Sequence, residues 1–261
     1  MPTRRVIGVD IGATRLLAGA VDASLAVHHR TRRALSGSEQ PILLDAALDA
    51  IDETRDAAGA EVAAVGLAVR SFGAEISDAM SPATIAQLMA ERVGLPAFAE
   101  TAANVVALAE QRGGAARGAR DVVAVMIDRD LEVGAMVGGE LVNVGFAPAI
   151  GWDGIGDLGR LTELAHDGDR EAAEGLWGLG ERIGQTIANF VRMYAPQVLV
   201  LSGSAVAAGE LLLAPVRSGL AGTGVASPGD GVPIVTARFG ADAGIAGAAA
   251  LALGGLERSP A

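Results

Sequence analysis

The chain has 261 residues, of which 51% are hydrophobic, 20% are charged and 3% are aromatic. Its 31 acidic residues outnumber 20 basic residues, all of them arginine, so the formal net charge is −11. A chain without lysine cannot provide a lysine base or a P-loop lysine, and its acidic balance argues against nucleic-acid binding. The absence of cysteine excludes disulfides and thiolate zinc sites, so we expect no zinc.

The first half of the chain predicts alternating strands and helices. An apolar strand that starts at Val6 runs through the turn Asp10-x-Gly12-x-Thr14 into a second strand at 16–21. The spacing of apolar residues and of Pro and Gly then predicts further elements. These are a helix over 41–58, a buried strand over 62–69, a helix over 82–93 capped by Ser81, a short strand over 95–99 and a helix over 101–111.

A glycine-rich stretch at 113–118 marks the boundary that we predict between two domains, 1–112 and 119–261. Beyond it the opening pattern of strand, polar turn and strand returns, as in a duplicated domain. The predicted elements are strands at 122–127, 131–137, 141–142 and 198–201 and helices at 180–194, 210–220 and 241–253. Strands that alternate with helices favour an α/β fold.

The chain shows no signal for export or for membrane insertion. No apolar run reaches about 18 residues, so no membrane span is expected. The strand-like start leaves no room for a signal peptide, and we expect a cytoplasmic protein. The one basic run, Arg30, Arg32 and Arg33, is interpreted as a solvated strand end. His28, His29 and His166 are too scattered to chelate a metal together.

The turn Asp10-x-Gly12-x-Thr14 is the first candidate for chemistry. It offers backbone N–H groups and a hydroxyl to a phosphate, and its carboxylate suits a magnesium-bound water. The same residues also form ordinary hairpin turns, so the motif alone leaves both interpretations open.

Four stretches, at 9–14, 100–110, 196–204 and 233–249, resemble the ROK family of sugar kinases and repressors, within the actin, Hsp70 and hexokinase-like fold. The resemblance implies two RNase-H-like lobes, with ATP in the cleft between them and a sugar hydroxyl directed at the γ-phosphate. It also implies a homodimer and a final helix that crosses back to the first lobe. Because the sequence starts at the first phosphate strand, we expect no operator-binding domain.

Residue by residue, the resemblance assigns nucleotide contacts to three turns: the first phosphate turn, part of a glycine-rich adenosine loop, and a C-terminal turn that shapes the cleft. The matching residues are, in that order, Asp10, Gly12, Thr14 and Arg15, then Gly203 and Ser204, then Gly240, Asp242 and Gly244. Asp10 would hold Mg²⁺. Arg15 stands where the family often has lysine, which keeps the charge but changes its shape.

The family's sugar motif, Glu-Asn-Asp-Ala-Asn, is changed at its catalytic position. In the family, the Asp takes the proton of the sugar hydroxyl; here the stretch reads Glu100-Thr101-Ala102-Ala103-Asn104. Phosphoryl transfer to an alcohol needs such a base, and Ala102 cannot accept a proton. The candidate substrate contacts are Glu100, Thr101, Asn104, Trp152 and Asp153. A buried Trp beside a loop Asp explains the last two equally well.

The second phosphate turn also departs from the family, where it is usually Gly-Thr-Gly. Here it reads Asp128-Arg129-Asp130. Either Asp128 or Asp130 has become a substitute base or a metal ligand, or the loop no longer meets phosphate. The zinc segment of the family is replaced at 146–151.

Two functions follow from these departures. The first is a degenerate ROK protein without conventional sugar phosphorylation, which binds a small ligand or a partner or uses the old cleft for another reaction. The second is an active ATP-dependent kinase of a small polyhydroxy compound, with Asp128 or Asp130 as the base.

Overall fold

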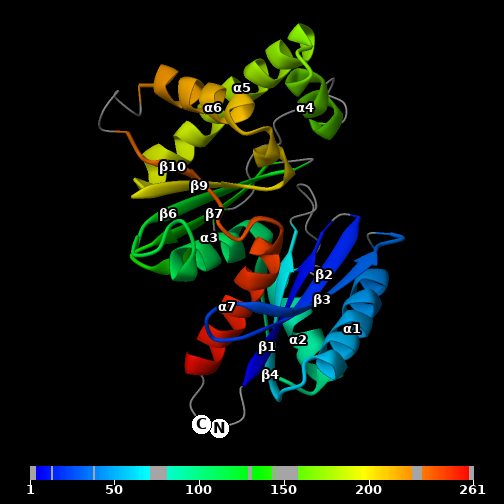
Figure 1. Cartoon of the computed structure of the whole chain (residues 1–261). Helices are drawn as coiled ribbons and strands as arrows, with labels where there is room; N and C mark the ends of the chain where they lie inside the picture. The colour runs from blue at the N-terminus through cyan, green and yellow to red at the C-terminus, as the bar shows by residue number, and fades with distance from the viewer. Residues whose placement is uncertain are drawn as a thin grey trace. The chain divides into compact units, whose positions relative to one another are not determined.

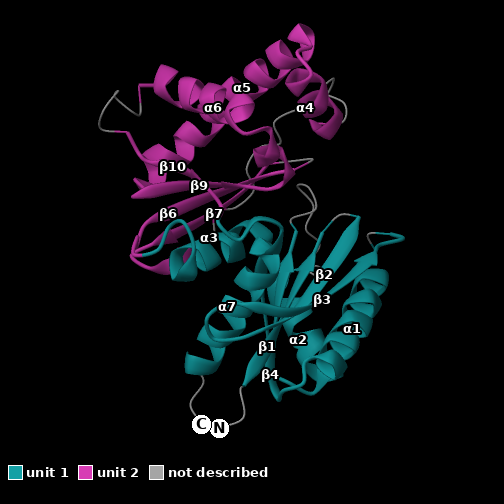
Figure 2. Ribbon diagram, viewed as in Figure 1, with its two compact units in different colours: residues 1–117, 238–261 teal, residues 118–237 magenta. Residues whose placement is uncertain are grey.

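The computed structural model describes residues 4–12, 14–37, 39–70, 81–128, 131–142, 144, 158–224 and 231–258. The chain divides into two compact units (Figure 2). Unit 1 comprises residues 1–117 and 238–261, and unit 2 comprises residues 118–237. Each unit contains one five-stranded sheet with helices packed on it, so the predicted α/β class is confirmed.

Unit 1 is a sheet in the order β3-β2-β1-β4-β5 with helices on both faces (Figure 1). α1 and α2 pack on one face and α3 and α7 lie on the other, so that two separate apolar clusters form. The elements are β1 (Arg5–Ile11), β2 (Arg15–Val21), β3 (Val27–Ala34), α1 (Gln40–Ala57), β4 (Val62–Val69), α2 (Pro82–Val93), β5 (Ala97–Thr101), α3 (Ala102–Gly113), η3 (Gly240–Asp242) and α7 (Ala243–Arg258).

The boundaries of α2 follow from three residues. The Ser81 hydroxyl accepts a hydrogen bond from the backbone N–H of Thr84 at 3.2 Å, and Pro82 occupies the first turn. Gly94 ends the helix in the left-handed conformation, with φ of 69°, which a residue without a side chain adopts at little cost. The predicted start and end of this helix are therefore confirmed.

α7 packs unusually close to the sheet because two central strands carry glycine beneath it. A Cβ atom at Gly8 of β1 would overlap the carbonyl oxygen of Ile245, and one at Gly66 of β4 would overlap that of Ala248. Backbone therefore meets backbone at these two points, and the small residues of α7 fill the remaining space. This close fit ties the C-terminal helix to the first sheet of the chain.

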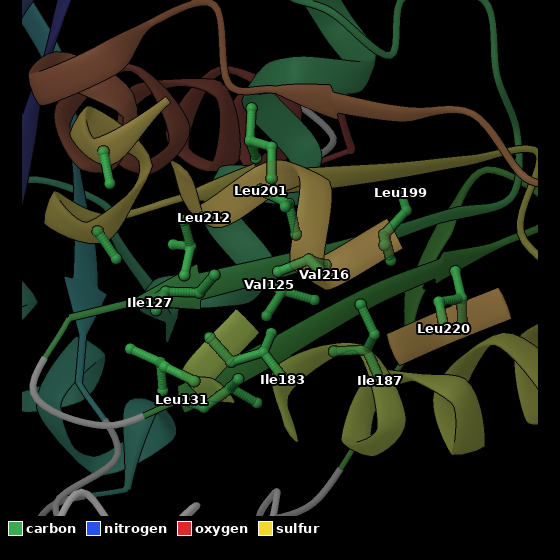
Figure 3. Packing of buried hydrophobic residues seen from close by; sticks show 14 of the residues in the cluster. Val125, Ile127, Leu131, Ile183, Ile187, Leu199, Leu201, Leu212, Val216 and Leu220 are labelled. Atoms are coloured by element: carbon green, nitrogen blue, oxygen red, sulfur yellow. The ribbon is translucent and has the colours of Figure 1, made fainter. Parts of the chain in front are cut away.

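Unit 2 is a sheet in the order β10-β9-β6-β7-β8. Its elements are β6 (Val122–Ile127), β7 (Leu131–Val137), β8 (Glu140–Val142), α4 (Leu158–His166), α5 (Arg170–Tyr194), β9 (Val198–Ser202), η2 (Ser204–Ala208), α6 (Glu210–Gly222) and β10 (Ile234–Thr236). Figure 3 shows its core, in which Val125 and Leu201 of the sheet meet Ile183 of α5 and Val216 of α6. Each such buried side chain contributes about 1.5–3 kcal/mol of transfer free energy.

The two sheets have the same topology. In unit 1 the first strand pairs antiparallel with the second and parallel with β4; in unit 2, β6 pairs antiparallel with β7 and parallel with β9. Read from the opposite edge, the second order is β8-β7-β6-β9-β10, which repeats β3-β2-β1-β4-β5. Residues 238–261, which follow the predicted boundary, are grouped with unit 1. The resemblance had implied that the final helix crosses back to the first lobe.

Candidate functional site

Unit 1 brings several of the predicted residues to one edge of its sheet. β1, β4 and β5 are parallel, so their carboxyl ends share an edge. Asp10 of β1 is in register with Ala68 of β4, which is in register with Glu100 of β5. Register partners point to the same face, and strands are about 4.8 Å apart, so the Cα atoms of Asp10 and Glu100 lie roughly 10 Å apart.

The first phosphate turn is a tight connection between β1 and β2. The N–H of Gly12 donates to the carbonyl of Arg15 at 2.9 Å, and the carbonyl of Thr14 accepts from the N–H of Leu35 at 3.0 Å. A Cβ at Gly12 would lie 2.8 Å from the Arg15 carbonyl oxygen, so the turn requires glycine at this position. A turn fixed on both sides can present its backbone to a ligand without reorganising.

Asp10 lies against the start of α7. A Cβ atom at Gly244 would come within 2.5 Å of an Asp10 carboxylate oxygen, so the missing side chain of this glycine leaves room for the carboxylate. A helix N-terminus favours negative charge beside it, which suits an ionised Asp10.

Asp10 fits the role of a magnesium ligand only in part. Mg²⁺ keeps several waters and is commonly held by one or two carboxylates together with substrate phosphates, which a single Asp10 can satisfy. Among the described residues, no group of three or more His, Cys, Asp or Glu side chains is placed to hold a metal. The arrangement therefore suits a magnesium ion that arrives with nucleotide phosphates.

The position to which the resemblance assigns the catalytic base lies at the junction of β5 and α3. Ala102 is the first residue of α3 and is 1% exposed. Before it, a Glu100 side-chain oxygen accepts a hydrogen bond from the N–H of Thr101 at 2.7 Å, and Asn104 is buried one turn into the helix. The predicted substrate residues Glu100, Thr101 and Asn104 thus lie at the same strand-to-helix junction as the methyl group of Ala102.

The C-terminal turn is held by an ion pair that the sequence did not reveal. Asp242, expected at the nucleotide, accepts two hydrogen bonds from Arg30 of β3, at 2.8 and 2.5 Å. Arg33 of the same strand pairs with Glu53 at 2.8 Å. Arg30 and Arg33 of the basic run thus form ion pairs, but their side chains remain 55% and 35% exposed, as expected for a solvated strand end. Gly240 precedes Asp242 with φ of 54°.

In unit 2 the predicted residues meet at the carboxyl ends of β6 and β9. The Asp128 carboxylate accepts a hydrogen bond from the N–H of Ser204 at 2.7 Å. Gly203 has φ of 91°, and a Cβ there would overlap the backbone of Ile127. Asp128 therefore closes the loop after β9, which is a structural role. Asp130, Trp152 and Asp153 lie outside the described residues.

Sequence reasoning missed a buried carboxylate at the other end of α3. The Glu110 side chain is fully buried and accepts hydrogen bonds from two backbone N–H groups, of Ala115 at 2.7 Å and of Phe239 at 3.1 Å. A signal was present, since Glu110 follows Val106 and Ala107 by four and three residues and so shares the apolar face of the helix.

The histidines do not form a joint site. His28 Nε2 lies 2.6 Å from a carboxylate oxygen of Asp22, whereas the ring of His29 lies 3.3 Å from the Thr31 hydroxyl. Partial burial works against ionisation of Asp22, but hydrogen bonds from the Ser24 hydroxyl, from His28 and from the N–H groups of Ser24 and Ala26 outweigh it. Together they hold the pKa of the Asp22 carboxyl well below its usual range.

Within the described part of the chain, no helix has both the length and the apolar character that crossing a membrane would require.

Comparisons with known proteins find a glucokinase and a bifunctional enzyme among the relatives of this chain. The chain is 29% identical over 145 residues to a glucokinase of Streptomyces coelicolor, which covers 52% of this chain and 44% of that protein. It is 28% identical over 291 residues to the bifunctional enzyme NanE/NanK of Brucella suis, which covers 96% of this chain and 54% of that protein. The chain thus spans about half the length of these curated relatives.

The fold matches a solved structure along nearly its whole length. A ROK family glucokinase from Streptomyces griseus, in complex with glucose and AMPPNP, aligns with a TM-score of 0.79 and 23% identity over 96% of this chain and 99% of that one. The predicted two-lobe architecture of the sugar-kinase type is therefore confirmed. A model of the ROK family matches residues 6–160 and 155–254. This match extends over most of both units, and the chain belongs to the ROK family.

Proposed function

We propose that this chain is a sugar-kinase-like protein that binds Mg-ATP and a small sugar-like ligand but does not carry out conventional sugar phosphorylation. The observation that carries the proposal is Ala102 at the first position of α3. Removing the proton of an alcohol in the transition state is worth about 10²–10⁴-fold in rate, and a methyl group supplies none of it.

The retained parts of the site support ligand binding. The first phosphate turn keeps its glycine and its closing hydrogen bond from Gly12 to Arg15. Asp10 keeps a position beside the start of α7 that suits a nucleotide-borne magnesium ion. Glu100 and Asn104 keep their places at the junction of β5 and α3. Binding and proton transfer depend on different side chains, so the first can persist after the second is lost.

Restoring the carboxylate tests the proposal. We expect Ala102→Asp, combined with Thr101→Asn, to phosphorylate glucose at least about 100-fold faster than Ala102→Asn in the same background. The two variants differ only in whether the new side chain can accept a proton, and the first turn of α3 favours a negative charge. A coupled assay of ADP release measures both. Equal rates in the two variants would show that the missing base is not what limits the reaction.

A second candidate is an active ATP-dependent kinase that uses Asp128 or Asp130 as its base. It is favoured by the relatives, which are named as a glucokinase and as NanE/NanK. One observation argues against Asp128 as the base. Its carboxylate accepts a hydrogen bond from the N–H of Ser204, so one carboxylate oxygen is already used in a loop contact. This candidate predicts glucose phosphorylation by the unaltered chain, abolished in Asp128→Asn or Asp130→Asn.

The homodimer stays a prediction from the resemblance, and the cytoplasmic location stays a prediction from the sequence. The net charge of −11 supports a small-molecule ligand over nucleic acid, because backbone phosphates repel an acidic surface.

A further inference from the structure

The chain passes between its two units twice, once from unit 1 into unit 2 and once back into unit 1. The first follows α3, where unit 1 ends at Arg117 and unit 2 begins at Gly118. The second follows β10, where unit 2 ends at Ala237 and unit 1 resumes at Arg238. Each connection has one end in unit 1. We call residues 114–117 the first end and residues 238–239 the second end.

One carboxylate binds both of these ends. Glu110 Oε2 accepts the N–H of Ala115 at 2.7 Å in the first, and Glu110 Oε1 accepts the N–H of Phe239 at 3.1 Å in the second. The two oxygens of one fully buried side chain thus connect segments that lie 124 residues apart in sequence, since 239 − 115 = 124.

The surrounding backbone is built around this carboxylate. The carbonyl of Glu110 accepts the N–H of Gly114 at 3.0 Å and that of Ala116 at 3.1 Å. A Cβ at Gly114 would overlap Glu110 Oε2, so glycine is required where the first end passes the carboxylate. Because a buried carboxylate without hydrogen bonds is costly, any movement of either end away from Glu110 is opposed.

The unit 2 ends of the connections are held by different groups. The side-chain oxygen of Gln197 accepts the N–H groups of Arg120 and Asp121 at 2.7 and 3.1 Å. The N–H of Ala237 donates to the carbonyl of Leu201 at 2.8 Å. Between the anchors of the first connection lies Gly118, with φ of 90° and open space where a side chain would be. Only on the unit 1 side do the two connections share one group.

We propose that Glu110 is a positioning residue that couples the two connections, so that the units change their relative arrangement about one shared anchor. The shared carboxylate makes a displacement of one end depend on the other. With two independent anchors, each connection could loosen alone. This inference concerns the chain's own mechanics and does not depend on whether the protein phosphorylates a sugar.

Hydrogen exchange of the unaltered protein gives the first test. If one carboxylate holds both ends, the N–H groups of Ala115 and Phe239 become exposed in the same opening event. We expect them to exchange with the same opening free energy and the same dependence on low concentrations of denaturant. Different denaturant dependences for the two would overturn the proposal.

The variant Glu110→Gln gives the second test. Its side chain keeps the size of the original but offers one acceptor oxygen to two donors, so each N–H is released part of the time. We expect both to exchange about tenfold faster or more, as befits the loss of a charge-assisted hydrogen bond. The matched control is Thr54→Val, which removes a different buried hydrogen bond of unit 1, from Thr54 to Thr31. The control should leave the exchange at 115 and 239 unchanged.

Distance measurements between the units separate coupling from local stability. Since the chain has no cysteine, Ala57→Cys and Gln185→Cys, at exposed positions of α1 and α5, permit specific fluorescent labelling. In single-molecule energy transfer we expect Glu110→Gln to broaden the distance distribution and Thr54→Val to leave it unchanged. Faster exchange at one N–H only, at neither, or at both without broadening would overturn the proposal.

Discussion

Ala102 is the residue on which the proposed function depends most. It begins α3 directly after Thr101. The function proposed above rests on its methyl group, which cannot accept the proton of an alcohol as phosphoryl transfer requires. The neighbouring Asn104 remains buried in the same first turn. In the proposed site, this strand-to-helix junction therefore carries no carboxylate at position 102.

Asp22 is the residue whose ionisation most clearly bears on stability. Its depressed pKa means that folding favours the ionised form. The ordinary value for Asp is about 3.9, so the contribution is fully present above about pH 4 and is lost as the pH falls further. We expect the difference in melting temperature between the unaltered chain and Asp22→Asn to shrink as the pH is lowered from 7 to 3. A difference that stays constant over this range would contradict this assignment.

The hydroxyl of Ser24 provides a partial control for this effect. It donates to Asp22 at 2.6 Å, beside the N–H of the same residue at 2.8 Å. Ser24→Ala removes only the hydroxyl bond, so we expect it to reduce the pH-dependent difference without abolishing it.

At the scale of whole elements, the sequence predicted best where caps and apolar periodicity agreed. Ser81, Pro82 and Gly94 defined α2 because each acts locally, through a hydroxyl cap, a fixed φ and a left-handed turn. The strands over 122–127 and 131–137 were also placed correctly. Their side chains are nearly all buried, which makes the apolar run itself the signal.

The missed elements have physical reasons. β3 is an edge strand whose exposed positions carry His28, Arg30 and Arg32. Because the less exposed positions between them are also largely polar, the sequence shows no alternation of polar and apolar residues. α4 was not predicted at all. α5 begins ten residues before the predicted start, because Gly175 and Gly178 interrupt the helical pattern. The cap that starts α5 was readable, since Asp169 accepts the N–H of Ala172 at 3.0 Å.

Contacts between distant segments could not be predicted from the sequence. Arg30 and Asp242, or Glu110 and Phe239, meet only after the C-terminal helix has packed on the first sheet. The candidate site was therefore predictable where it consists of local motifs, such as the turn at Asp10 and the junction at Ala102. The residues of the site that form long-range ion pairs or hydrogen bonds could not be predicted in this way.

The packing of α7 on the first sheet makes a prediction about glycine. Gly66→Ala would force a Cβ into the carbonyl of Ala248, and overpacking of this kind typically costs about 1–3 kcal/mol. Gly222→Ala, near the end of α6 where nothing lies within 4 Å of the added Cβ, should instead be neutral or stabilise by up to about 1 kcal/mol. Chemical denaturation measures both free energies of unfolding. Equal effects would contradict the close backbone approach.

At the scale of the whole molecule, the chain consists of two topologically identical sheets joined by two connections. The predicted boundary near 113–118 lies next to the first connection. The second connection was not placed by composition, because residues 237–239, Ala-Arg-Phe, contain no glycine and only one polar residue. It is the packing of α7 against β1 and β4 that returns the chain to unit 1.

The most direct test of the account is a calorimetric titration of Mg-ATP into the unaltered protein in the presence of excess glucose. Binding and catalysis give different signals, because binding heat is saturable and turnover gives a sustained heat flow after each injection. We predict saturable heat with a Kd between micromolar and sub-millimolar, about −5 to −8 kcal/mol, and no sustained flow. Sustained heat flow would contradict the loss of the base at Ala102, and the absence of any heat would contradict the retained nucleotide site.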